Sequence, residues 1–220
     1  MGHSRASYRY LERHILPRIE KQSASPLRIA DIGAGNLLDV LPARVAGPSA
    51  VAIDILADPS GWARCWTPLS GADHFPAHQR RVRRPADCVW SLDLGIYNAS
   101  IHYSTDYRRT LMEMRRCLRP NGRFLIVDSP VYKRREHGEM MVRERHRQFQ
   151  STYGFASDKM PSIEYFDLDM LDTLSRELGI EWKVDRPWYG WQWAMRPWKA
   201  RWNKKRPPSN FWILTGRFLS

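Results

Sequence analysis

The stretch Leu27-Arg28-Ile29-Ala30-Asp31-Ile32-Gly33-Ala34-Gly35-Asn36 decides the fold. Its first half predicts a short strand buried on both faces, because apolar residues dominate it. Gly33 and Gly35 allow the backbone to turn tightly and to approach a ligand closely. Residues 37–41 then supply the apolar side of a helix. A strand, a glycine turn and a helix in this order form the nucleotide-handling corner of a doubly wound α/β sheet.

Further strands and helices alternate downstream of this corner. Strands are predicted at residues 50–55, 92–98 and 123–128, with a helix over 106–118 and an Asn-Gly turn at 119–122. Such alternation predicts a mostly parallel sheet with helices on both faces. The stretch between the second and third of these strands is less regular. A short helix around residues 62–69 and one hidden strand are both compatible with it.

The two ends of the chain complete the predicted layout. Residues 7–22 predict an amphipathic helix that Pro17 kinks or divides. That helix either packs on the sheet or forms a lid with Tyr8 or Tyr10 over a ligand. After a basic, helical segment over 131–154, a helix is predicted at 165–178 with Gly179 as its C-cap, and two last strands at 181–184 and 211–214.

Composition indicates one globular domain. The 220 residues carry 35 Lys and Arg against 23 Asp and Glu, a formal charge of +12. We divide the domain into an N-terminal helix or lid (1–24), a cofactor-binding core (25–132) and substrate-side helices with a basic hairpin (133–220). No apolar run long enough to span a membrane is present, and no secretory signal is recognised. Three isolated cysteines make neither a disulfide framework nor a zinc spacing, so we expect a cytoplasmic location and no metal.

Four motifs in a fixed order resemble class I S-adenosylmethionine-dependent methyltransferases. They are the glycine turn, Ile53-Asp54, residues 92–103 and residues 118–128, and together they cover roughly residues 25–132. The nearest likeness is to small bacterial enzymes that methylate small molecules and quinone-type lipids. The resemblance implies a Rossmann-like α/β sheet of about seven strands, mostly parallel, ending in an antiparallel hairpin. It also implies S-adenosyl-L-methionine as the cofactor.

The cofactor-binding positions that we predict are Asp31, Gly33, Ala34, Gly35, Asp54, Ile55, Asp87, Cys88 and Asn98. By resemblance, the glycine loop passes under the methionine part of the cofactor with Asp31 supporting it. Asp54, about 20 residues beyond the turn, is also where α/β nucleotide sites hold a ribose. Asp87 and Cys88 are the candidates for the adenine, and Asn98 borders the methyl-transfer cleft. Leu38 occupies the third position of the dinucleotide fingerprint, which argues against a nicotinamide cofactor.

Three residues near strand ends are candidates for catalysis. His102 follows the strand at 92–98 and is a candidate base that titrates near neutrality. Tyr103 and Tyr132 lie at similar strand-end positions. Each of the three has the alternative role of shaping the wall of the pocket. Methyl transfer needs a base only where the acceptor must lose a proton.

The last part of the chain is rich in tryptophan and positive charge. Seven of the ten tryptophans fall between Trp182 and Trp212, and residues 183–206 hold eight Lys or Arg and one acid. The tryptophans either cap the sheet and wall the pocket, lie at an anionic membrane interface, or stack on RNA bases. We expect methyl transfer to a small acceptor, apolar or lipid-like acceptors included, with peripheral membrane contact. An RNA methyltransferase and a non-catalytic binding protein of the same fold are the alternatives.

Overall fold

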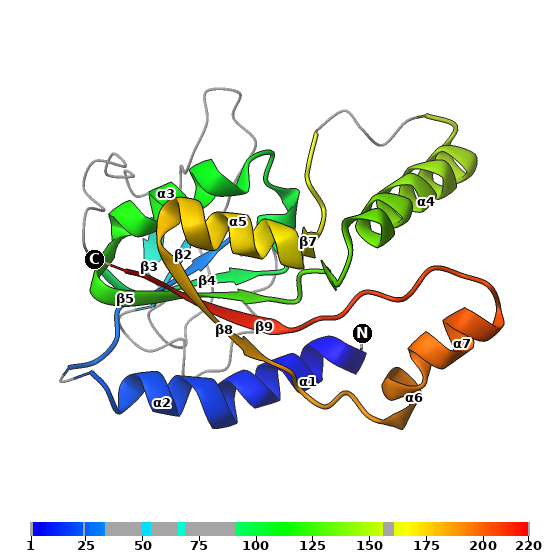
Figure 1. Ribbon diagram of the computed structural model, residues 1–220. Helices are drawn as coiled ribbons and strands as arrows, with labels where there is room; N and C mark the ends of the chain where they lie inside the picture. The colour runs from blue at the N-terminus through cyan, green and yellow to red at the C-terminus, as the bar shows by residue number, and fades with distance from the viewer. Residues whose placement is uncertain are drawn as a thin grey trace.

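The computed structural model describes residues 2–23, 25–33, 50–53, 66–68, 91–155 and 161–219. Across these residues, seven strands form one sheet in the order β3-β2-β1-β4-β5-β9-β8 (Figure 1). The strands are β1 (Ile29–Ile32), β2 (Ala50–Ile53), β3 (Trp66–Pro68), β4 (Leu92–Asn98), β5 (Leu118–Val127), β8 (Ile180–Asp185) and β9 (Ile213–Phe218). β1 pairs in parallel with β2 and β4, and β4 pairs in parallel with β5. β9 runs antiparallel to both β5 and β8, which confirms the predicted sheet and its C-terminal hairpin.

Two layers of helices cover the sheet. Strand β5 is apolar on both of its faces, so each face of the sheet needs a cover. Phe124 and Ile126 belong to one apolar cluster, and Leu125 and Val127 belong to another on the opposite face. The first face is covered by α3 (Tyr107–Cys117) and α5 (Leu168–Leu178). The second is covered by the N-terminal helix, which runs below the sheet in Figure 1.

The N-terminal helix has three parts. α1 (Gly2–Tyr10) passes into a π-helical turn, η1 (Leu11–Ile15), and then into α2 (Leu16–Glu20). Pro17 lies in the first turn of α2, where it has no N–H to bond the preceding π-helical turn, so it divides the helix as predicted. Leu11, Ile15 and Ile19 are buried against the sheet.

Local capping explains where α3 and α5 begin. The Asp106 carboxylate accepts a hydrogen bond from the Arg109 backbone N–H at 3.0 Å, as an N-cap does. The Asp167 carboxylate does the same for the Met170 N–H at 2.7 Å. The helix predicted over residues 165–178 therefore begins later than expected, at Leu168, and its predicted start at residue 165 is wrong. Phe166–Asp167 forms strand β7 instead, which pairs with β6 (Val131–Tyr132).

Further boundaries confirm or correct the sequence predictions. Gly179 ends α5 at φ 64°, which confirms it as the C-cap. α4 (Arg135–Tyr153) is the basic helix predicted after the core, and it ends at Gly154. The prediction of a short helix around residues 62–69 is wrong at Trp66, because this residue begins strand β3. β3 lies at the edge of the sheet, where a Trp-Thr-Pro sequence is tolerated.

The predicted turn at 119–122 lies inside β5 as an irregularity rather than a separate loop. The register with β4 jumps between Leu92 and Leu94, and Asn121 adopts φ 67°. Among the described residues, no helix combines the length and the apolar character needed to cross a bilayer.

The end of the sheet at which β4, β5 and β8 finish carries the remaining helices. β5 leads through β6 to α4, while β8 leads to α6 (Trp191–Ala194) and α7 (Arg196–Trp202) (Figure 1). In open α/β sheets, ligands bind outside the carboxyl ends of the strands. This end is therefore where the site is sought.

Candidate active site

The carboxyl ends of β1, β4 and β5 lie next to one another and form the centre of the site. Ile32 is in register with Tyr97, and Asn98 with Val127. The Ser100 hydroxyl donates to the Ile32 carbonyl at 2.5 Å and so ties the loop after β4 to the end of β1. Predicted residues from separate parts of the sequence therefore meet at this edge.

Gly33 is required at the end of β1 for two independent reasons. Its φ is +77°, a conformation that side-chain-bearing residues rarely adopt. A Cβ at this position would also lie 2.4 Å from the Ser100 Cβ, far inside normal contact. The backbone of the glycine turn therefore packs directly on the loop that follows β4.

Asp31 is a buried carboxylate with unsatisfied hydrogen-bonding capacity. Both of its oxygens are buried and have no hydrogen-bond partner among the described residues. Burial raises its pKa to about 7. A buried carboxylate without partners is costly unless a ligand supplies donors or positive charge. Asp31 is thus suited to receive a cationic or N–H-bearing ligand.

Asn98 lies at the end of β4 and is held by the N-terminal helix. The Tyr8 hydroxyl donates to the Asn98 Oδ1 at 2.6 Å, and the Asn98 Nδ2 is buried with no partner among the described residues. Of the two candidate lid residues, Tyr8 reaches this edge. Tyr10 instead donates its hydroxyl to Asp185 at 3.2 Å, at the end of β8.

A second bond joins the same helix to the end of β5. The Ser7 hydroxyl donates to the Asp128 Oδ1 at 2.8 Å and lies 3.0 Å from the Tyr189 hydroxyl. Asp128 has φ 51°, and Ala99, at the end of β4, has φ 50°. Such conformations in residues other than glycine concentrate at functional sites, where the surrounding structure holds them.

His102 lies beside these strand ends, but it does not titrate near neutrality as expected. Its Nδ1 lies 3.2 Å from the Ser129 hydroxyl. Burial, together with the positive charge of Arg145, lowers the pKa of the imidazole to about 4. The ring is therefore neutral at physiological pH.

The two tyrosine candidates occupy different environments. Tyr103 is exposed, with its ring 4.4 Å from the ring of His102. Tyr132 is buried, and its hydroxyl accepts a hydrogen bond from the Arg206 guanidinium at 3.1 Å. Burial raises the pKa of Tyr132, with Arg206 acting in the opposite direction. A buried, protonated phenol orients neighbours better than it removes protons.

The structure adds Glu164, which the sequence reasoning missed. It is 3% exposed, adopts φ 72°, and donates its backbone N–H to the His102 carbonyl at 2.8 Å. One carboxylate oxygen pairs with Arg145 and lies 3.2 Å from the His146 Nε2. The other is buried without a partner among the described residues. An acid within the apolar run 163–166 is the signal in the sequence that could have identified it.

Six predicted positions lie outside the described residues. They are Ala34, Gly35, Asp54, Ile55, Asp87 and Cys88. The glycine loop beyond Gly33, the ribose acid and the adenine pair therefore stay predictions.

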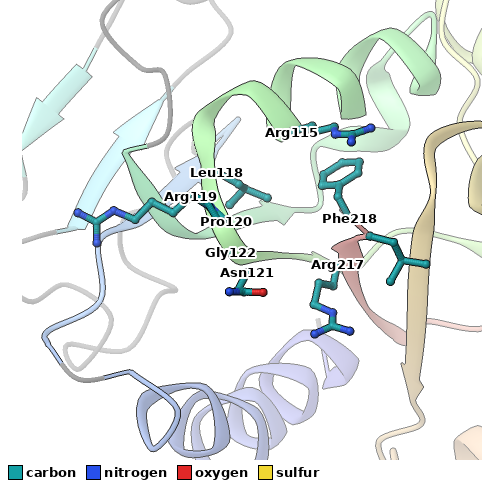
Figure 2. A pocket seen from close by; sticks show the side chains of 9 residues that line it. Arg115, Leu118, Arg119, Pro120, Asn121, Gly122, Arg217 and Phe218 are labelled. Carbon is teal, nitrogen blue, oxygen red and sulfur yellow. The ribbon is translucent and has the colours of Figure 1, made fainter.

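A cavity of about 470 Å³ lies at the opposite end of β5 (Figure 2). It is lined by Arg115, Leu118, Arg119, Pro120, Asn121, Gly122, Arg217, Phe218 and Leu219. Its arginines already have partners, because Arg119 pairs with Asp93 at 3.1 Å and Arg217 pairs with Glu181 at 2.9 Å. This cavity lies away from the strand ends that gather the predicted site, so we assign it no part in that site.

Comparison with known families identifies the family of the chain. The model of the methyltransferase domain family matches residues 3–181. The chain belongs to this family. Membership confirms the resemblance to class I S-adenosylmethionine-dependent methyltransferases, and with it S-adenosylmethionine as the cofactor.

Solved structures share the fold of this methyltransferase. The YcgJ protein from Bacillus subtilis is 12% identical, with a TM-score of 0.52 and coverage of 93% of this chain and 97% of that chain. An S-adenosylmethionine-dependent methyltransferase from Mesorhizobium loti is 15% identical, with a TM-score of 0.50 and coverage of 91% and 96%. No curated protein sequence matches the chain.

The described residues fit this cofactor. The unpartnered oxygens of Asp31 suit a ligand that carries positive charge and N–H donors. Gly33, which has no side chain, lets the backbone of the turn lie directly against the loop after β4. The Nδ2 of Asn98, which has no partner among the described residues, offers a donor at the end of β4. Asp31, Gly33 and Asn98 are therefore the residues that would hold the cofactor in the described part of the site.

Proposed function

We propose that this methyltransferase acts on a small acceptor that enters beside His102, Ser129 and Glu164. The proposal is carried by the half-buried, neutral His102, whose ring contacts Ser129 just after β5 and whose carbonyl accepts the Glu164 N–H. Bound S-adenosylmethionine supplies a methyl group on a positively charged sulfur, a good leaving group. The protein's main contribution is to align the acceptor for in-line displacement.

The ionisation of the pocket restricts the acceptor. A histidine whose pKa is about 4 accepts a hydrogen bond at neutral pH but removes protons weakly. It can therefore orient an O–H or N–H acceptor whose proton leaves easily, or stand beside a nucleophile that carries no proton. The unpartnered oxygen of Glu164 offers a second acceptor for such a group.

Cofactor titration tests the enzymatic part of the proposal. Asp31→Asn should weaken S-adenosylmethionine binding about 10- to 150-fold, the value of a hydrogen bond to a charged group. Asp172→Asn is the matched control, because this acid lies exposed on α5 in an ion pair with Arg176. Isothermal titration calorimetry provides the measurement. If the wild-type protein had no measurable affinity for the cofactor, the alternative of a non-catalytic binding protein with the same fold would be the one left.

A labelling experiment tests the acceptor. Radioactive methyl groups from S-adenosylmethionine should enter solvent-extractable small molecules when the enzyme is incubated with a cell extract. Label that enters RNA instead would refute the proposal in favour of an RNA methyltransferase. His102→Gln separates the roles of the histidine, since loss of a true base lowers kcat about 100-fold or more. Loss of an orienting contact mainly raises KM.

A further inference from the structure

The helices α6 and α7 present a row of exposed tryptophans. The exposed fractions are 63% for Trp188, 77% for Trp191, 74% for Trp198 and 89% for Trp202. Met195, between them, is 54% exposed. Large apolar side chains are exposed singly on many proteins, but a contiguous group marks an interaction surface. We call these five residues the tryptophan face.

The spacing of the tryptophan face is that of one side of a helix. Residues 191, 195, 198 and 202 follow one another at intervals of four, three and four. Backbone hydrogen bonds continue through the junction of α6 and α7, because the Met195 N–H bonds the Trp191 carbonyl and the Lys199 N–H bonds the Met195 carbonyl, each at 3.0 Å. The side chains at 191, 195, 198 and 202 therefore share one face of a continuous helical segment. Trp188 lies just before it, with its ring edge-on to that of Trp191 at 5.4 Å.

The other side of this segment already packs on the protein. The Trp193 ring lies 5.0 Å from the ring of Tyr189 and 5.8 Å from that of Phe211. The Arg196 guanidinium stacks over Trp193 at 3.7 Å from the ring centre. Trp193 therefore anchors the segment, whereas the tryptophan face is not needed for that packing. The four exposed tryptophans therefore do not cap the sheet, as one of the expectations had it.

Positive charge surrounds the tryptophan face. Residues 186–212 contain seven Lys or Arg and no Asp or Glu. Lys199, Arg201, Lys204 and Lys205 are exposed, and none of them forms an ion pair within the described part of the chain. An apolar face rich in Trp beside unpaired Lys and Arg is the composition of a helix that lies in the interface of an anionic bilayer.

We infer that the tryptophan face docks on the surface of a membrane containing anionic phospholipids, with Lys199, Arg201, Lys204 and Lys205 at the headgroups. This inference does not depend on the acceptor or on catalysis. RNA is the less favourable partner, because three of the four exposed tryptophans share one outward side of a helix, whereas single-stranded nucleic acid is bound in a groove.

The docked surface belongs to the same end of the molecule as the active site. Arg206, just after α7, bonds the Tyr132 hydroxyl at 3.1 Å and the Glu144 carboxylate at 2.7 Å. Tyr189, just before α6, lies within hydrogen-bonding distance of the Ser7 hydroxyl at 3.0 Å. A membrane on the tryptophan face would therefore lie close to the edge where the acceptor enters.

Vesicle binding tests the inference. Wild-type protein should bind vesicles of phosphatidylcholine mixed with phosphatidylglycerol, with a blue shift of tryptophan emission, and bind pure phosphatidylcholine far more weakly. The variant Lys204→Gln/Lys205→Gln should lose affinity about 20- to 30-fold, since each charge contributes about five-fold near an anionic surface. The variant Trp198→Ala/Trp202→Ala should lose about ten-fold or more.

Matched controls make the result decisive. Met112→Ala and Arg109→Gln remove an exposed apolar side chain and an exposed charge from α3, and both should bind vesicles as the wild type does. Unchanged urea unfolding and S-adenosylmethionine affinity in the α7 variants show that fold and cofactor site are intact. Absence of wild-type binding, equal loss in the controls, or tighter binding of single-stranded RNA that the α7 variants abolish would overturn the inference.

Discussion

Replacing Gly33 by alanine tests the contact on which the cofactor corner rests. The new Cβ meets two costs, because φ is +77° and the Ser100 Cβ lies 2.4 Å away. A side chain in the left-handed region costs about 1–2 kcal/mol. Forcing a methyl group into a filled space costs about 1–3 kcal/mol. Together these predict a loss of about 2–5 kcal/mol in the free energy of unfolding.

A second glycine of the chain separates the two costs. Gly154 has φ +76°, and a Cβ there meets nothing within 4 Å. Gly154→Ala should therefore show only the conformational cost of about 1–2 kcal/mol. The difference between the two variants isolates the clash with Ser100. Urea unfolding monitored by circular dichroism, with the slope m checked for constancy, measures both.

The double variant Gly33→Ala/Ser100→Gly completes the cycle. Removing the Ser100 Cβ leaves the Ser100 Cα at 3.7 Å from the new methyl group, an ordinary contact. The serine change alone should cost about 1 kcal/mol, because its hydrogen bond to the Ile32 carbonyl is lost. The double variant should be more stable than the sum of the single effects by about 1–3 kcal/mol. Additive effects, or equal losses in Gly33→Ala and Gly154→Ala, would refute the reasoning.

Three further perturbations probe the same edge of the sheet. The pKa of Asp31 is raised to about 7 in the native state, so between about pH 4 and pH 7 this carboxyl binds more protons in the native than in the unfolded state. Asp31 alone therefore lowers stability as the pH rises through this window, whereas the lowered pKa of His102 acts in the opposite direction below about pH 6.5. The free energy of urea unfolding should therefore rise more steeply with pH in Asp31→Asn than in the wild type. Tyr8→Phe removes the donor to the buried oxygen of Asn98 and should cost about 1–3 kcal/mol, with weaker binding of S-adenosylhomocysteine in calorimetry. Glu164→Gln weakens a buried ion pair and should cost about 1–3 kcal/mol in thermal unfolding, whereas Glu139→Gln, in exposed pairs, should cost under about 1 kcal/mol.

Local signals in the sequence predicted the elements that local physics controls. The strand of the glycine turn, the strand at 92–98 and the Asp106-capped helix follow from apolar pattern and capping chemistry, which act over a few residues. The first residue of α5 was placed wrongly because Asp167 is both a strand residue and an N-cap. The π-helical turn before Pro17 leaves no comparable mark in the sequence.

The chemical state of the site could not be predicted from the sequence. His102 was placed correctly near the strand ends, but its pKa depends on burial and on Arg145, more than forty residues away in the chain. Glu164 reaches the site through its bond to the His102 carbonyl, a contact that only the folded chain creates. The sequence also could not predict that the tryptophan face is exposed, since the same helical spacing is found on buried helix faces.

The insertion of α6 and α7 between two paired strands makes this part of the chain separable from the rest. Asp185 and Ile213 are register partners in β8 and β9, so the chain leaves the sheet and returns to it at one point. The entropy of closing such a loop grows only with the logarithm of its length, about 0.6 kcal/mol for each doubling. The segment can therefore lengthen, shorten or change its surface during evolution while the strand order is kept.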